Sequence, residues 1–188
     1  MDIKGFFDTI DHELLLRAVR HHTDCRWVLL YIERWLKAPM MLEDDNTVSQ
    51  ECGTPQGGVI SPLRANLFLH YAFDKWMDRE NPHVPFERYA DDIICHCRTE
   101  CEVPRLWRQV EDRFAGCGLT LHPQKTKIVY CKDTNRKGSF PSVAFDFLDC
   151  RFQRRLAIWR GGLFGVSYLP AASPKALKAF RRRARNWG

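Results

Sequence analysis

The sequence lacks any long hydrophobic run. No apolar stretch in its 188 residues approaches the roughly 20 residues that a membrane helix needs. The N-terminus has no signal-peptide pattern of basic, apolar and small-residue regions. Internal repeats and low-complexity segments are also missing, so repeat and fibrous architectures are excluded. We therefore expect an intracellular, cytoplasmic protein without a membrane partner.

Paired cysteine motifs are missing too, although the chain has eight cysteines. Most of them are scattered singly, and the closest group lacks the C-x-x-C spacing of structural zinc sites. That group is Cys95, Cys97 and Cys101. We interpret the cysteines as free thiols of a reducing compartment, with zinc binding by the closest group as the alternative.

The composition that is present describes one globular domain. Hydrophobic residues make up 45% and charged residues 28% of the chain, which excludes a disordered or fibrous protein. The formal net charge is +6 and the pI is near 9.0. Because the positive charge collects at the C-terminal end, we expect a polyanionic partner there.

Hydrophobic periodicity and turn residues predict alternating strands and helices. Asp11 is expected to cap the first helix, and Ser61 to cap a later one that starts at Pro62. The predicted strands are 1–7, two short ones around a turn at 43–46, the hairpin 86–90 and 93–98, 127–131, and a hairpin from 145–152 and 157–166 with a turn at 161–162. The predicted helices are 11–19, 24–37, 62–79, 103–117 and a basic helix from Ser173 and Pro174. This order favours an α+β fold of ferredoxin-like type, an antiparallel sheet covered by helices on one face.

Two adjacent acids, Asp91 and Asp92, occupy the tip of a hairpin whose strands are mostly apolar. Like charges this close repel, and each raises the pKa of the other, so a bound cation would relieve the repulsion. Asp2 adds a third carboxylate at the end of another strand. If that strand lies beside the hairpin, Asp2 and Asp91 are placed to hold two Mg²⁺ ions, with Mn²⁺ as a substitute. The alternative for the acidic pair alone is a solvated turn.

Five segments together carry a more specific resemblance. They read DIKGFFD from residue 2, GTPQGGVISP from residue 53, YADD from residue 89, GLTL from residue 118 with KTK from residue 125, and Phe147-Leu148. In this order they resemble motifs A to E of reverse transcriptases. The Gln-Gly-Gly form of the second motif, followed by ANLFL from residue 65, is most similar to group II intron-encoded proteins.

The resemblance implies a role for each matching residue at the catalytic centre. Asp2, Asp91 and Asp92 would be the catalytic, metal-binding acids of a reverse-transcriptase palm, and the backbone carbonyl of Ile3 would also contact a metal. Lys125 would donate a proton to the departing pyrophosphate. The ordinary alternative for this lysine is a solvated side chain.

The resemblance also implies a nucleotide site. Phe7 would be the aromatic gate against a ribose 2′-hydroxyl, with Phe6 as the fallback. Gln56 would contact the incoming nucleotide, while Gly57 and Gly58 would let the backbone approach it closely. The alternatives are core positions for the two phenylalanines and an ordinary turn for the glycines.

Primer and template contacts are expected near the C-terminal end. By resemblance Phe147 and Leu148 begin the primer grip, and the last helix would contact phosphates along a template and primer duplex. A solvated helix face is the alternative. The cations concerned are Lys178, Arg181, Arg182 and Arg185. Residues 1–169 would then form the palm, and residues 170–188 the start of a thumb or maturase region.

The resemblance covers nearly the whole chain but leaves out parts of the family's architecture. The fingers would precede residue 1 and the rest of the thumb would follow residue 188, so we expect a truncated form with weak or no activity alone. Asp149-Cys150 replaces the usual Gly-Tyr after Phe-Leu, and Arg64 replaces an aliphatic residue. Asp149 would place negative charge near the primer backbone, and Arg64 would be buried unless its charged end snorkels to the surface.

The predicted function is RNA-directed DNA polymerisation by two-metal nucleotidyl transfer to a primer 3′-hydroxyl. Its partners would be an RNA template, a DNA primer, deoxynucleoside triphosphates and intron RNA in a bacterial ribonucleoprotein. One alternative is an RNA-binding maturase fragment without polymerase activity. A palm-fold nucleotide cyclase is a weaker alternative, because its Gly-Gly-Asp/Glu hairpin is missing.

Overall fold

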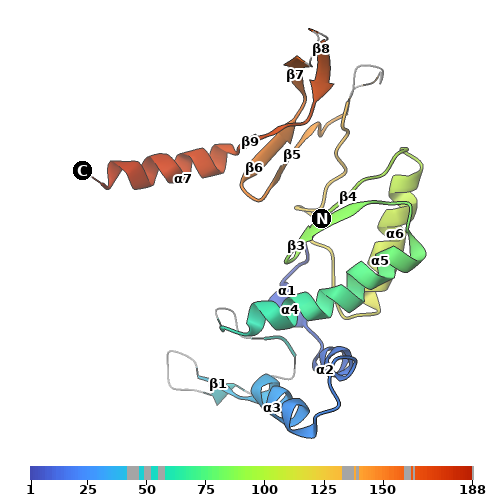
Figure 1. The fold of residues 1–188 in the computed structure, drawn as a ribbon, viewed down its shortest axis with the longest axis vertical. Coiled ribbons are helices and arrows are strands. Elements are labelled where there is room, and N and C mark those ends of the chain that lie inside the picture. Colours follow the sequence, from blue (N-terminus) through green and yellow to red (C-terminus); the bar gives the residue numbers. More distant parts are fainter. Residues whose placement is uncertain are drawn as a thin grey trace. The chain divides into compact units, whose positions relative to one another are not determined.

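A computed structural model describes residues 1–41, 47–48, 52–54, 58–132, 138, 140–158, 162 and 164–187. These residues form two compact units, Met1–Thr126 and Lys127–Gly188 (Figure 1).

The first unit combines helices with two hairpins. Its helices are α1 (Phe6–Thr9), α2 (His12–Arg20), α3 (Arg26–Lys37), α4 (Ser61–Leu69), the π-helical segment η1 (His70–Asp74), α5 (Lys75–Glu80) and α6 (Glu102–Ala115). Its strands are β1 (Met40–Met41), β2 (Thr47–Val48), β3 (Phe86–Tyr89) and β4 (Asp92–Cys95), paired antiparallel as β1–β2 and β3–β4. The predicted turn at 43–46 lies outside the described residues.

The core of the first unit lies between the β3–β4 hairpin and the helices α1, α4, η1 and α6. Phe73 of η1 is fully buried against Phe86 of β3 and Phe114 of α6, with ring centroids 5.2 and 5.9 Å away. Ile93 of β4 and Phe6 of α1 complete this cluster. Burying a side chain of this size contributes about 1.5–3 kcal/mol. The apolar positions of the helices therefore fix them on one face of the hairpin.

The two predicted N-terminal helices are confirmed. Asp11 caps α2 by accepting a hydrogen bond from the backbone N–H of Leu14 at 2.7 Å, which satisfies one of the unpaired donors at a helix start. The helix predicted at 24–37 is α3, which begins two residues later. It ends at Lys37, two residues before Pro39, where a proline would interrupt the helical hydrogen bonds.

The strand predicted at 1–7 is wrong beyond its first residues. Ile3 forms an isolated antiparallel bridge with Leu121, and the chain then turns at Gly5, whose φ is +56°. Glycine adopts this left-handed backbone at little cost. The turn leads into the single helical turn α1, so Phe6 and Phe7 are helical and not extended.

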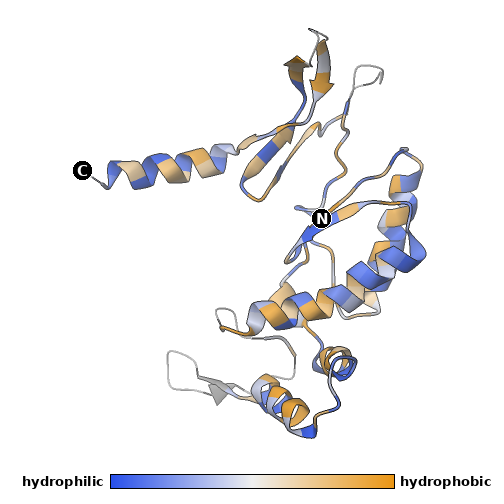
Figure 2. Cartoon of the chain, viewed as in Figure 1, coloured by the Kyte–Doolittle hydropathy of each residue, from blue (hydrophilic) through white to orange (hydrophobic). Residues whose placement is uncertain are grey.

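The helix predicted at 62–79 is correct in extent but not in form. It starts at Ser61 without a side-chain cap, because the buried Ser61 hydroxyl instead accepts a hydrogen bond from the Thr54 hydroxyl at 3.2 Å. Its path is also interrupted by the five-residue π-helical segment η1 between α4 and α5. Figure 2 shows that α4 is mostly hydrophobic, whereas α5 is mostly hydrophilic.

The second unit is built from short antiparallel strands and one helix. Strands β5 (Ala144–Phe147), β6 (Cys150–Gln153) and β9 (Pro170–Ala172) form a three-stranded sheet, while β7 (Arg155–Ile158) pairs with β8 (Phe164–Ser167). Helix α7 (Pro174–Arg185) follows, and the Ser173 hydroxyl accepts a hydrogen bond from the N–H of Ala176 at 3.1 Å. The predicted cap at Ser173 is confirmed.

Two strand predictions in the second unit are wrong. No strand forms at 127–131 within the described residues, where Tyr130 donates one backbone bond to Ser142 beside Pro141. A proline has no N–H and therefore prevents a regular ladder there. The region 145–152 is itself a hairpin, β5–β6, because Leu148 and Asp149 both adopt positive φ and reverse the chain. A second hairpin, β7–β8, follows with Gly162 near its turn; residue 161 lies outside the described part.

The protein is a mixed α+β fold with small antiparallel sheets. Within the described residues, no helix is both long and apolar enough to span a membrane. The eight cysteines are free thiols. Burial raises the pKa of the Cys95 thiol to about 12, so its reactive thiolate form is rare at neutral pH.

Candidate active site

The predicted acidic hairpin is the β3–β4 pair. Tyr89 lies opposite Asp92, so Ala90 and Asp91 form a two-residue connection. Ala90 has a φ of +52°, as the first connecting residue of tight hairpins often does. Because side chains alternate along a strand, the buried Ile93 faces the helices and the exposed Asp92 faces away from them.

The segment that carries Asp2 lies directly beside β4. Met1 and Ile93 exchange both backbone hydrogen bonds, at 2.5 and 3.0 Å. In an antiparallel pair the next residue on one strand lies opposite the preceding residue on the other, so Asp2 lies across from Asp92. On its other edge, the Asp2 carbonyl accepts from the N–H of His122 at 2.8 Å. Residues 1–4 therefore join the acidic hairpin to residues 120–122.

The charge of the acidic site is partly neutralised by one lysine. Lys125 places its Nζ 3.2 and 3.5 Å from the two carboxylate oxygens of Asp2, and the Asp2 side chain is only 17% exposed. Thr126 fixes the same segment, since its hydroxyl accepts from the Asp2 N–H and donates to the Asp2 carbonyl, both at 3.3 Å. The structure thus brings Lys125 to the predicted acids.

Electrostatic repulsion remains at Asp92. Asp92 is exposed as a residue, but partial loss of water around its carboxylate raises its pKa, and the charges of Asp91 and Asp2 raise it further. The three acids therefore share one electrostatic environment although they come from two separate segments. A bound cation would lower the cost of ionising them.

These residues suit a hard divalent cation by their chemistry. Carboxylate oxygens are the ligands that Mg²⁺ prefers, usually one or two together with substrate phosphates and water. Within the described residues, however, no three histidine, cysteine or acidic side chains converge closely enough to form a metal cluster. The Asp2 carboxylate turns toward Lys125. The predicted carbonyl ligand, Ile3, lies in the core. The hydrogen bonds on either side of its bridge with Leu121 use the carbonyls of Asp2 and Thr120.

The two predicted aromatic gate residues differ in burial. Phe6 is 2% exposed and lies in the core beside Phe68, with ring centroids 6.4 Å apart. Phe7 is only partly buried against that core, and its carbonyl accepts from the N–H of Thr54 at 2.7 Å. The open part of Phe7 leaves it, and not Phe6, available to a ligand.

The glycine-rich segment docks onto helix α1. Gly53 has a φ of +87°, and a Cβ added there would lie 2.9 Å from the carbonyl oxygens of Phe7 and Asp8. Only glycine lets the two backbones come this close. The contact joins the glycine-rich segment to Phe7 and Asp8, a few residues after Asp2. The predicted nucleotide contacts Gln56 and Gly57 lie outside the described residues, whereas Gly58 is half-buried and its carbonyl accepts from Ser61 at 3.1 Å.

Arg64, the residue in place of an aliphatic one, is buried. It is 7% exposed, its Nη1 donates to the Thr54 hydroxyl at 3.4 Å, and its guanidinium lies 5.9 Å from the Trp35 ring. Its Nε has no hydrogen-bond partner among the described residues. Burial lowers the pKa of Arg64. The aromatic contact compensates part of the cost of burying this charge.

The expected primer and template residues lie in the second unit. Phe147 ends β5, and Leu148 is exposed in the turn with a φ of +49°. Asp149 shares that turn, and its carbonyl accepts from the N–H of Ser173 at 2.8 Å. The four predicted cations all lie exposed on α7: Lys178, Arg181, Arg182 and Arg185.

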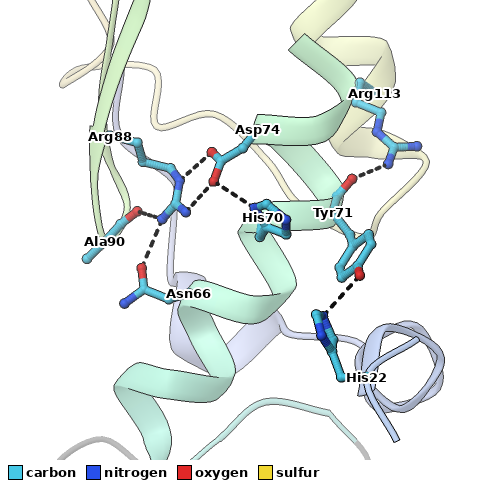
Figure 3. A network of polar contacts seen from close by, with 8 residues as sticks. All are labelled: His22, Asn66, His70, Tyr71, Asp74, Arg88, Ala90 and Arg113. Atoms are coloured by element: carbon cyan, nitrogen blue, oxygen red, sulfur yellow. Dashed lines mark hydrogen bonds and ion pairs between the residues drawn. The ribbon is translucent and has the colours of Figure 1, made fainter. Parts of the chain in front are cut away.

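The residues that support the acidic turn on the side that faces the helices were not predicted from the sequence. Arg88 of β3 makes two hydrogen bonds to Asp74 of η1, and further bonds to the Asn66 side chain and the Ala90 carbonyl (Figure 3). Arg113 of α6 donates to the carbonyls of Tyr71 and Ala72 in the same π-helical segment. The available signal was the position of Arg88, which falls on the same face of β3 as Phe86, whereas the other charged residue of the strand, Glu87, falls on the exposed face.

Fold and site together define an α+β protein with an acidic centre at the tip of an antiparallel hairpin. Residues 1–161 match the family model described as "Reverse transcriptase (RNA-dependent DNA polymerase)". Because this match covers most of the chain, the protein belongs to the reverse transcriptase family.

Individual relatives match parts of the chain. It is 31% identical over 165 residues to Protein YkfC of Escherichia coli, covering 70% of this chain and 43% of that protein. It is 40% identical over 97 residues to the group II intron-encoded protein LtrA of Lactococcus lactis, covering 48% of this chain and 16% of that protein. A putative COX1/OXI3 intron 2 protein of Saccharomyces cerevisiae is 28% identical over 80 residues, or 43% of this chain and 9% of that protein. The chain thus spans less than half the length of these relatives.

Proposed function

We propose that this chain is the palm region of a group II intron type reverse transcriptase. Residues 1–169 would form the palm, with an antiparallel sheet of ferredoxin-like type, and residues 170–188 the start of a thumb or maturase region. The observation that carries the proposal is the placement of Asp2 across from Asp92 beside Asp91. The similarity to the group II intron-encoded protein LtrA supports the choice of subfamily.

In this proposal each side chain near the acids has a defined task. Asp2, Asp91 and Asp92 supply carboxylate oxygens for two Mg²⁺ ions, which on binding neutralise phosphate charge and activate the primer 3′-hydroxyl. Lys125, whose Nζ lies 3.2 Å from Asp2, protonates the departing pyrophosphate. Phe7 excludes a ribose 2′-hydroxyl, and Gln56, Gly57 and Gly58 contact the incoming deoxynucleotide.

A second candidate function rests on the exposed cations of α7. The chain would then bind intron RNA, within an intracellular ribonucleoprotein, without polymerising DNA. The basic helix carries no acidic residue between Pro174 and Arg185, so its field attracts phosphates along its whole length. This function needs neither the acids nor the nucleotide site.

Primer extension separates the two functions. The full 188-residue chain is incubated with an RNA template, a labelled DNA primer, deoxynucleotides and Mg²⁺, beside an Asp91→Asn variant of the same size. We expect low, template-dependent extension that Asp91→Asn reduces by at least about a hundredfold, since one lost charge ligand removes several kcal/mol of electrostatic stabilisation.

Asp78→Asn on α5 is the matched control, because it removes an exposed carboxylate away from the acidic centre. Extension that survives Asp91→Asn would refute the proposed site. No extension by the wild type, together with salt-sensitive retention of intron RNA, would favour the RNA-binding function.

A further inference from the structure

We propose that Arg88 is a positioning residue that holds the acidic turn in place by clamping it to the π-helical segment η1. The proposal rests on the proposed function for the meaning of the turn, but not for the clamp itself. The clamp comprises Arg88, Asp74, Asn66 and the Ala90 carbonyl.

The β3–β4 register sets the direction of the Arg88 side chain. Arg88 lies opposite Ile93 in the β3–β4 register, and directly opposite residues share one face of a sheet. Since Ile93 is fully buried, Arg88 points toward the helices, beneath the turn. Its side chain is only 11% exposed, which is unusual for an arginine.

The guanidinium group of Arg88 donates hydrogen bonds to three residues. The Nε and Nη2 groups of Arg88 donate to the two Asp74 carboxylate oxygens at 2.7 and 2.6 Å. This two-point pairing fixes the plane of the guanidinium. Nη1 is thereby directed at both the Asn66 carbonyl oxygen and the Ala90 carbonyl, each at 3.0 Å (Figure 3).

The contact with the Ala90 carbonyl supports a backbone conformation that is unfavourable by itself. Ala90 has a φ of +52°, a conformation that costs a residue with a Cβ free energy and persists only when its surroundings enforce it. The Arg88–Ala90 bond supplies such enforcement at the peptide that joins Ala90 to Asp91. Arg88 therefore orients Asp91 indirectly, through the backbone carbonyl of Ala90.

The π-helical segment η1, which Arg88 contacts, is also bound by Arg113 of α6. Arg113 donates its Nε to the Ala72 carbonyl at 2.9 Å and its Nη2 to the Tyr71 carbonyl at 3.0 Å. A π-helical turn displaces carbonyls from regular α-helical bonds, so such external donors stabilise it. Arg88 and Arg113 thus both bind this segment, but only Arg88 reaches the turn.

This difference provides a matched pair of variants in the full chain, Arg88→Lys and Arg113→Lys. Lysine keeps the charge but cannot form the planar two-point pairing. Two readouts are used: hydrogen exchange of the amides of residues 90–93, and Mn²⁺ binding measured by electron paramagnetic resonance. Asp91→Asn identifies which bound Mn²⁺ belongs to the acids.

We expect Arg88→Lys to speed exchange at residues 90–93 by about tenfold and to weaken Mn²⁺ binding by about 10- to 100-fold, as loss of a supporting contact around a metal site does. Arg113→Lys should lower thermal stability but leave Mn²⁺ affinity within about twofold of the wild type. If Arg88→Lys does not fold, Asp74→Asn, which removes the partner charge instead, is predicted to give the same two changes.

Unchanged exchange and unchanged Mn²⁺ affinity in Arg88→Lys, or equal Mn²⁺ losses in both lysine variants, would overturn the clamp. A different outcome tests the proposed function. Mn²⁺ binding that Asp91→Asn does not weaken would refute the metal site, whereas faster exchange in Arg88→Lys would still support the clamp.

Discussion

At the scale of single residues, the acidic centre contains a carboxylate, that of Asp92, whose ionised form is disfavoured in the folded protein. Burial, followed by the carboxylates of Asp91 and Asp2, raises the pKa of Asp92. A carboxyl group with a higher pKa in the folded chain binds its proton more tightly there than in the unfolded chain. Its contribution to stability is therefore fully present below the unfolded pKa and is lost as the pH rises through the folded pKa.

Asp92→Asn should accordingly stabilise the fold at pH 7 relative to the wild type. The difference should shrink as the pH falls below about 4, where the wild-type carboxyl group becomes protonated in both states. Urea unfolding at several pH values measures it. Added Mg²⁺ should stabilise the wild type more than the variant, since a cation that binds only the folded state shifts the equilibrium by mass action.

Asp78→Asn serves again as the exposed control. A wild type that is more stable than Asp92→Asn at pH 7 without Mg²⁺ would contradict the electrostatic picture of this site.

At the scale of elements, the β5–β6 hairpin turns through two residues that both adopt left-handed backbone. Leu148 and Asp149 have φ of +49° and +60°, where an aspartate is tolerated but glycine is preferred. Asp149→Gly should make the protein more stable than Asp149→Ala by about 1 kcal/mol. Urea unfolding, with hydrogen exchange of the β5–β6 amides, measures this difference.

The same pair of substitutions at Asp146 is the internal control. Asp146 lies within β5, where glycine is less stable than alanine by about 0.5–1 kcal/mol. The order of the two variants should therefore reverse between the two sites. The same order at both would mean that backbone conformation does not govern the turn.

These elements also show what the sequence could and could not predict. The β3–β4 hairpin and the caps at Asp11 and Ser173 were predictable, because apolar alternation and capping residues act over a few neighbouring positions. The Leu148 turn was not, because leucine carries no turn signal. Neither was η1, which is contacted by Arg88 and Arg113 from distant segments.

The same difference between local sequence signals and long-range contacts applies to the candidate site. The adjacency of Asp91 and Asp92 was visible in the sequence, whereas the lysine partner of Asp2 arises from a residue 123 positions away. The clamp by Arg88 required three elements to be placed together. Long-range pairing of this kind leaves no local pattern.

At the scale of the whole molecule, charge is distributed unevenly between the two units. The first unit carries the acidic centre, and the second ends in the exposed basic helix α7. Hydrophobic residues interrupt the hydrophilic ones along this helix (Figure 2), and Leu177 and Phe180 are exposed. Its cations suit the phosphates of a nucleic acid.

Alanine at Lys178, Arg181, Arg182 and Arg185 should weaken binding to RNA–DNA duplex and make it less sensitive to salt. If each cation contacts one phosphate, the slope of log K against log salt should fall by about 3–4, since each contact contributes roughly 0.9. Fluorescence anisotropy at several salt concentrations measures the slope.

The control replaces four exposed cations on two other helices, Arg17, Arg20, Arg105 and Arg108. Equal losses of slope in both variants would show that net charge, and not helix α7, determines binding.

The π-helical segment has a further consequence for how this chain tolerates insertions and deletions. A π turn accommodates one residue more than an α turn, so α4 and α5 are offset by about 100° relative to one continuous α-helix. Removing a single residue from His70–Asp74 would restore regular winding and rotate Asp74 away from Arg88. The number of residues between the glycine-rich segment and the acidic hairpin therefore matters as much as their identity, because it fixes the rotation of Asp74 about the helix axis relative to Arg88.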